Sequence, residues 1–228
     1  MNNVPFRVRV DRFYVTTPIY YVNDRPHIGH AYTTVVADVL ARYHRLFSVP
    51  TFFLTGTDEH GQKVQQAARA AGVSPKEHAD RMVVRFQELW RTLEITNDDF
   101  IRTTESRHTS AVQAVLQELF ERGEIYRAEY DGWYDVTSET FVTERDLQVP
   151  EGQTPADLPN IVRIREANYF FRMSAYRDWL LEYIESHPDF IRPEFRRNET
   201  LGFLRTKELG DLCISRPKSR LAWGIELP

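Results

Sequence analysis

Two histidines placed three positions apart are the residues of this sequence best suited to chemistry. His27 and His30 flank Gly29, at the point where an extended apolar run over residues 13–20 gives way to a helical pattern. On the first turn of a helix, side chains three positions apart face the same way, and imidazole nitrogens can donate hydrogen bonds to phosphate oxygens. Gly29 leaves bare backbone, on which a flat adenine ring can lie without meeting a Cβ atom. The pattern predicts a site for a nucleoside triphosphate.

A strand and a helix must hold this pair in place. The helical pattern begins at Ala31, and its apolar residues recur at three- and four-residue steps, which is typical of a helix that packs one face on a sheet: Val35, Val36, Val39, Leu40 and Tyr43. The free backbone N–H groups and the dipole of such a helix favour an anion at its N-terminus. The glycine-rich fingerprint of dinucleotide folds is missing, so the histidines take the place of glycines as phosphate ligands.

The segment Pro26–His30 resembles the His-Ile-Gly-His signature of the class I aminoacyl-tRNA synthetases and their nucleotidyltransferase relatives. The flanking residues are more specific than this short signature. Residues 14–23 lead into it and residues 53–61 follow the helix, and both segments are similar to the methionyl-tRNA synthetase family in its bacterial and mitochondrial forms. The resemblance continues to near the end of the chain through residues 99–104, 168–172, 214–217 and 223–225.

This resemblance implies ATP-dependent activation of methionine to methionyl adenylate, followed by transfer of the acyl group to tRNA(Met). The methionine carboxylate is already a nucleophile, so the protein has to align it with the α-phosphate and stabilise charge on the departing pyrophosphate. By the resemblance, His27 and His30 are the catalytic residues and, together with Gly29, the ATP-binding residues. Mg²⁺ is expected as a ligand that accompanies ATP.

The resemblance also implies a methionine site. Ile19 and Tyr21 fall where the family forms part of its methionine pocket, and Asp58 falls where a carboxylate receives the amino group. The residue types suit these roles, because a carboxylate at the end of a strand suits a cation and apolar side chains suit a flexible thioether. The expected substrate-binding residues are therefore Ile19, Tyr21 and Asp58.

Alternating strand and helix patterns predict an α/β fold. We expect the first half of a doubly wound parallel-sheet (Rossmann-like) nucleotide fold, with a small mixed α+β insertion domain. The expected boundaries are 1–123 for the first half of the catalytic fold and 124–210 for the insertion. Residues 211–228 are expected to return to the catalytic fold, which is truncated there.

Local signals predict where single elements begin. Ser74, Pro75 and Glu77 supply an N-cap, a proline at the first helical position and the glutamate of a capping box, so a helix should start there. Within the insertion, Ser174 is expected to cap a second helix. The strand-like run over residues 212–215 predicts that the chain rejoins the first sheet.

The composition excludes disulfides and cysteine zinc sites, and it argues against a membrane protein. Cys213 is the only cysteine of the 228 residues, so neither an intrachain disulfide nor a cysteine zinc knuckle can form. Many members of the family carry CxxC knuckles in the insertion, and the corresponding residues 133–140 have none. The resemblance is therefore to the zinc-free branch, and no structural zinc is expected. No window approaches ~18 consecutive apolar residues, so we expect no membrane partner and a cytoplasmic protein.

The family's second signature, Lys-Met-Ser-Lys-Ser, occurs nowhere in the sequence. Its lysines normally meet the triphosphate from the side opposite the histidines. The favoured hypothesis is the N-terminal catalytic portion of a methionyl-tRNA synthetase, inactive alone, whose C-terminal portion is truncated or lies on a second chain. The alternative is a stand-alone synthetase-like module that binds ATP or methionine without catalysis. A small nucleotidyltransferase is weakened by the long insertion.

Simpler explanations stay open for single features. A His-x-x-His pair can be a surface pair or a metal pair, although no carboxylate is spaced with it as a third ligand. Residues 192–220 carry eight basic and four acidic side chains, which suits either phosphate contacts or a solvated surface. Trp223 is either a core aromatic or part of the site.

Overall fold

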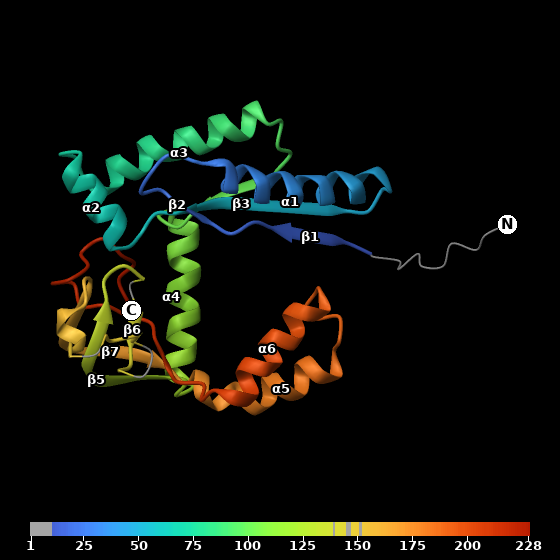
Figure 1. The fold of residues 1–228 in the computed structure, drawn as a ribbon. Coiled ribbons are helices and arrows are strands. Elements are labelled where there is room, and N and C mark those ends of the chain that lie inside the picture. The colour runs from blue at the N-terminus through green and yellow to red at the C-terminus, as the bar shows by residue number, and fades with distance from the viewer. Residues whose placement is uncertain (1–10, 139, 145–146, 151) are drawn as a thin grey trace. The chain divides into compact units, whose positions relative to one another are not determined.

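The computed structural model describes residues 11–138, 140–144, 147–150 and 152–228. By its internal contacts the chain divides into two compact units, which are described separately below. The first holds the residues up to Gln113 together with Trp223–Leu227, and the second holds Ala114–Ala222 and Pro228. Figure 1 labels their elements. No described helix has both the length and the apolar character needed to span a membrane.

The first unit is built on a parallel sheet, sheet A, which confirms the predicted fold class. Its strands are β1 (Phe13–Thr16), β2 (Tyr20–Tyr21), β3 (Thr51–Asp58) and β4 (Asp99–Arg102), and each of the other three pairs in parallel with β3. Thr57 of β3 is in register with Tyr20 and also with Arg102, so β2 and β4 flank β3 on opposite edges.

The apolar run that precedes the histidines forms two short strands instead of one. β1 and β2 both pair with β3, and residues 17–19 separate them. Pro18 has no backbone N–H to donate to a neighbouring strand, and the side-chain hydroxyl of Thr17 lies 2.7 Å from that of Thr55. β2 continues along the same edge of β3 as β1, and the break shifts the register by one residue, from the pair Thr16–Leu54 to the pair Tyr20–Thr57.

Three of the described helices lie wholly within the first unit: α1 (Ile28–Leu46), α2 (Gln62–Ala70) and α3 (Pro75–Thr92). Figure 1 shows α1 and α3 on the same side of sheet A. One core cluster joins β2 to α2 and α3, and its buried members are Tyr20, Val22, Val64, Ala79, Val83, Phe86 and Trp90. A second joins α1 to β3 through Ala37, Ala41 and Phe53. The face of α1 predicted to pack on the sheet is wrong, because the small residues Ala37 and Ala41 meet β3 while the predicted side chains are exposed: Val35, Val36, Val39, Leu40 and Tyr43. Burial of a side chain such as Phe53 contributes about 1.5–3 kcal/mol.

Helix α3 starts as the sequence predicts. The hydroxyl of Ser74 accepts a hydrogen bond of 3.2 Å from the backbone N–H of Glu77, and Pro75 takes the first helical position. The carboxylate of Glu77 forms an ion pair of 2.5 Å with Arg81, one turn further along. The N-cap is confirmed, while the glutamate supports the helix through an i,i+4 pair.

The second unit carries an antiparallel sheet, sheet B. Helix α4 (Ser106–Glu121) leads into it, and its strand order is β6 (Thr140–Val142), β5 (Ile125–Asp135), β7 (Ile161–Phe171) and β8 (Leu212–Cys213). The short helices η1 (Pro155–Asp157) and η2 (Met173–Tyr176) and the hairpin of α5 (Arg177–Ser186) and α6 (Glu194–Thr206) complete it. Strands and helices are mixed here, as expected for the insertion.

Two expectations about the second unit are wrong. Ser174 does not cap α5, because the N-cap of this helix is Tyr176. The hydroxyl of Ser174 instead donates a 2.5 Å hydrogen bond to the carboxylate of Asp211, which is a strong, charged acceptor. The run near Leu212 does not rejoin sheet A, since β8 pairs antiparallel with β7 in sheet B. Only Trp223–Leu227 cluster with the first unit. The domain boundaries 1–123, 124–210 and 211–228 stay a prediction.

Candidate functional site

The N-terminus of α1 is closed by the two histidines themselves. Helix α1 begins at Ile28, three residues before the predicted Ala31, because His27 is its N-cap. Nδ1 of His27 accepts the N–H of Gly29 at 3.1 Å, and Nδ1 of His30 accepts the N–H of His27 at 3.2 Å. The two rings stack with centroids 3.8 Å apart. The pair forms a reciprocal cap of the kind that Ser and Glu usually make.

This cap fixes the tautomer of both rings. An imidazole nitrogen that accepts a hydrogen bond carries no proton, so each neutral ring holds its proton on Nε2. Burial, and then the neighbouring His27, lower the pKa of His30. His30 is therefore neutral at pH 7 and acts as a hydrogen-bond donor. Two Nε2–H groups at the positive end of the helix dipole make a donor set for an anion.

Gly29 is needed for this arrangement of the rings. A Cβ atom at this position would lie 2.9 Å from Cε1 of His27, closer than real Cβ contacts. Any side chain would therefore push the His27 ring away from the Gly29 N–H. Contact with adenine stays a prediction for this glycine.

Tyr20 supports His30 from the sheet. Its buried ring lies 4.7 Å from the His30 ring between centroids, and its hydroxyl is 2.9 Å from the Thr34 hydroxyl on α1. Because strand side chains alternate, Tyr20 faces α1, and Tyr21 points to the opposite side. Tyr21 is 52% exposed and Ile19 is 40% exposed. The sequence pattern did not single out Tyr20.

The sheet brings two of the predicted methionine-site residues together. Tyr21 of β2 is in register with Asp58, the last residue of β3. Ile19 lies directly before β2. Ligands of open α/β sheets bind in the crevice outside the carboxyl ends of the strands, and that is where this register pair and the N-terminus of α1 are found.

The residue after Asp58 is a fully buried carboxylate. Glu59 has 0% exposure, and Arg102 of β4 binds it through two hydrogen bonds, of 2.6 Å from Nε and 2.9 Å from Nη2. The hydroxyls of Thr57 and Thr104 also donate to it, at 2.7 and 2.5 Å. A buried carboxylate with four donors is fully satisfied.

Trp223 closes the loop that follows β3. Its indole N–H donates to the carbonyl of Glu59, and its own carbonyl accepts the N–H of Gly61 at 3.4 Å. The indole ring lies 5.4 Å from the ring of His60. Burial lowers the pKa of His60, with His108 acting in the same direction and Glu59 opposing it. Trp223 also packs against the core cluster of α2 and α3, so it is both a core aromatic and a clamp on this loop.

Comparison with known proteins decides the family. The family model described as "tRNA synthetases class I (M)" matches residues 13–157 and 157–228, which is nearly the whole chain. The chain belongs to the class I tRNA synthetases. The resemblance noted in the sequence is confirmed.

Its relatives within this synthetase family are methionine–tRNA ligases. The chain is 51% identical to the ligase of Caldanaerobacter subterraneus subsp. tengcongensis, covering 95% of this chain and 33% of that protein. It is 50% identical to the ligase of Thermotoga maritima, covering 95% and 34%. The methionyl-tRNA synthetase of Mycobacterium tuberculosis in complex with methionyl-adenylate superposes with a TM-score of 0.87 at 43% identity, over 96% of this chain and 43% of that one. The chain spans about a third of the curated relatives' length.

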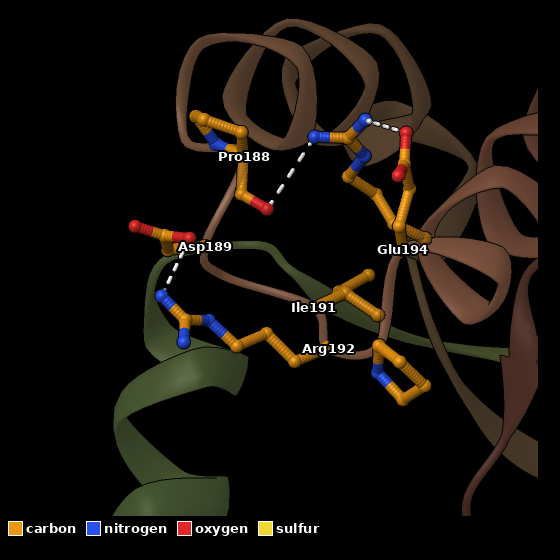
Figure 2. Close-up of a pocket in the computed structure, with 7 residues that line it drawn as sticks. Pro188, Asp189, Ile191, Arg192 and Glu194 are labelled. Atoms are coloured by element: carbon orange, nitrogen blue, oxygen red, sulfur yellow. Dashed lines mark hydrogen bonds and ion pairs between the residues drawn. The ribbon is translucent and has the colours of Figure 1, made fainter.

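The basic segment of this synthetase chain is largely paired with its own carboxylates. Figure 2 shows the turn between α5 and α6, where Arg192 pairs with Asp189 at 2.6 Å. Arg197 reaches the Pro188 carbonyl at 3.4 Å and Glu194 at 3.5 Å. Arg220 forms a 2.6 Å ion pair with Glu166 on β7. These contacts favour internal pairing over phosphate binding, at a solvated turn for Arg192 and in a largely buried pair for Arg220.

Proposed function

We propose that this chain carries part of the active site of a methionine–tRNA ligase. The proposed reaction is activation of methionine by ATP to methionyl adenylate, followed by transfer to tRNA(Met) in the cytoplasm. The observation that carries the proposal is the reciprocal histidine cap, which directs two Nε2–H donors from the N-terminus of α1. The family match and the methionine–tRNA ligase relatives support it.

His27 and His30 take the phosphate role in this proposal. ATP enters as its Mg²⁺ complex, the two imidazoles donate to phosphate oxygens, and their hydrogen bonds strengthen as charge builds on the departing pyrophosphate. A preorganised donor of this kind contributes about 2.7–4 kcal/mol to transition-state stabilisation. Among the described residues there is no group of three or more His, Cys, Asp or Glu side chains placed to hold a metal. In this proposal the Mg²⁺ belongs to the substrate complex because it accompanies ATP.

The methionine role falls to the carboxyl ends of β2 and β3. Asp58 receives the ammonium group, while Ile19 and Tyr21 contact the thioether side chain. The register of Tyr21 with Asp58 supports a common site, because it places an apolar ring and a carboxylate next to each other.

Calorimetric titration of the purified chain with methionine and with ATP tests the proposal. We expect both ligands to bind, and we expect methionine-dependent exchange of pyrophosphate into ATP to be near zero without the lysine-rich second signature of the family. A folded chain that binds neither ligand would contradict the proposal. Full exchange activity of the 228-residue chain would contradict the requirement for those lysines.

A further inference from the structure

Glu59 is a buried charged group to which the proposed chemistry gives no task. Its carboxylate has no exposure to solvent, and it is held by two nitrogens of Arg102 and by two threonine hydroxyls. A buried ion pair of this kind adds little to the free energy of unfolding, because the desolvation of both charges offsets their attraction. Apolar replacements of such a pair are often neutral or stabilising. Stability alone therefore does not explain why a charged side chain is buried at the end of this strand.

The ion pair ties together three elements of the first unit. Arg102 lies at the end of β4, Glu59 follows β3, and Nη2 of Arg102 also binds Asp80 on α3 at 2.6 Å. Asp80 in turn pairs with Lys76 at 2.7 Å. Burial alone would raise the pKa of Asp80, but the hydrogen bonds from Lys76 and Arg102 outweigh burial and lower it. The chain of charges fixes the guanidinium, which in turn fixes Glu59.

The backbone on both sides of Asp58 is held by the same segment. The N–H of Glu59, which belongs to the Asp58–Glu59 peptide, donates to the Thr103 hydroxyl at 2.9 Å. The N–H of Thr103 donates to the Thr57 carbonyl at 3.2 Å. The Glu59 carbonyl accepts the indole N–H of Trp223. Both peptide neighbours of Asp58 therefore have defined positions.

We propose that Glu59 is a positioning residue for the ammonium group of methionine, acting through Asp58. This inference rests on the proposed function. Arg102 neutralises Glu59 and locks it to β4 and α3, and the locked backbone sets the direction of the neighbouring Asp58 carboxylate. Glu59 thus fixes the end of β3, and the adjacent Asp58 binds the substrate. Thr103 serves the same end through the peptide N–H.

The test compares methionine with 4-(methylthio)butanoate, which keeps the thioether and the carboxylate but lacks the amine. Both compounds and ATP are titrated into the chain and into its Glu59→Gln variant, whose side chain has the same size without the charge. We expect the dissociation constant for methionine to rise at least tenfold, and those for the des-amino compound and for ATP to change less than twofold. A purely structural role would weaken all three together.

Two further variants keep the test decisive. Thr103→Val removes the acceptor for the Glu59 N–H and leaves the ion pair intact, so it should show the same selective loss even where Glu59→Gln fails to fold. Asp99→Asn is the matched control, because it removes the 2.5 Å ion pair with Arg107 at the other end of β4. It should bind methionine as the unmodified chain does.

The outcomes separate the two proposals. Failure of the unmodified chain to bind methionine overturns the proposed function and this inference with it. Binding of methionine by Glu59→Gln and Thr103→Val at the unmodified affinity overturns the inference alone. An equal loss for methionine and the des-amino compound also overturns it, because the amine would then be irrelevant to the effect.

Discussion

At the scale of single residues, the histidines of α1 combine a structural task with the chemical task proposed for them. Each Nδ1 accepts a backbone N–H of the first turn, and each Nε2–H is left as a donor for a ligand. The same hydrogen bonds that begin the helix therefore orient the donors. Gly29 is part of this design, since a side chain there would collide with the His27 ring.

Replacement of His27 should have an effect that loss of an ordinary N-cap does not have. His27→Ala removes an N-cap and a phosphate donor, so we expect a loss of about 1 kcal/mol in the free energy of unfolding. We also expect an ATP affinity about tenfold lower, since a hydrogen bond to a charged group contributes ~1.5–3 kcal/mol. Urea denaturation and calorimetry measure the two effects. Ser74→Ala is the control: it should lose similar stability and keep its ATP affinity. Equal losses of ATP affinity in both variants would refute the donor role.

The lowered pKa values of His30 and His60 predict weaker folding in mild acid. Histidine in an unfolded chain titrates near ~6.5, and the folded chain holds both groups neutral to lower pH. As the pH falls through ~6.5, the unfolded state takes up protons first, so stability present above this pH is lost below it.

Urea midpoints at about pH 7.5 and about pH 5.5 measure this loss, in a window above the ~3.9 at which aspartates titrate. We expect the midpoint to be lower at the acidic pH. In His60→Gln the difference between the two midpoints should shrink. An unchanged difference in that variant would show that His60 does not contribute.

At the scale of elements, β3 organises the site. It pairs with β1, β2 and β4, and its last residue is Asp58. The sequence was sufficient to predict the cap at Ser74, which depends on neighbours in the chain, and the parallel sheet, which the alternation of strand and helix patterns favours. It predicted the wrong face of α1, since small residues and not the larger apolar ones meet β3. It was not sufficient for the contact of Glu59 with Arg102, since an acid after one strand and a base at the end of another become neighbours only through strand register. The same holds for β8, whose partner strand is a matter of tertiary pairing.

Close pairing of β3 with β4 depends on Gly56. A Cβ atom there would lie 2.0 Å from the carbonyl oxygen of Ile101, so Gly56→Ala must force the two strands apart. We expect a loss of about 3 kcal/mol or more in the free energy of unfolding, at the upper end for overpacking. Gly202→Ala is the control, because it lies within α6 with open space around its Cβ position, and alanine there should add roughly 0.5–1 kcal/mol. Denaturant titration measures both, and a tolerated Gly56→Ala would contradict the strand spacing.

At the scale of the whole molecule, α1 leaves much apolar surface uncovered. Tyr32 is 71% exposed and Leu46 79% exposed, and further apolar side chains of the same helix are exposed, namely Ile28, Val35, Val36, Val39, Leu40 and Tyr43. Apolar patches of this kind mark interaction surfaces or cause association. The synthetase relatives are about three times as long as this chain.

This surface predicts that the isolated chain associates. Sedimentation velocity should show a weight-average mass that rises with concentration, because burial of apolar surface favours contact between copies. The double variant Val39→Lys with Leu46→Lys should reduce the rise without lowering the melting temperature, since both side chains are already in water. Val162→Lys, on the exposed side of sheet B, is the control and should leave association unchanged. Association that persists in the double variant would place the contact elsewhere.

The single thiol of the molecule can report how often one edge of sheet B opens. Cys213 sits in β8 at the edge of sheet B, half-buried, and burial raises the pKa of its thiol, so the reactive thiolate is disfavoured while the strand stays paired. A thiol-reactive label should then attach faster when β8 separates from β7. The labelling rate would report, in real time and at one position, how often this edge opens.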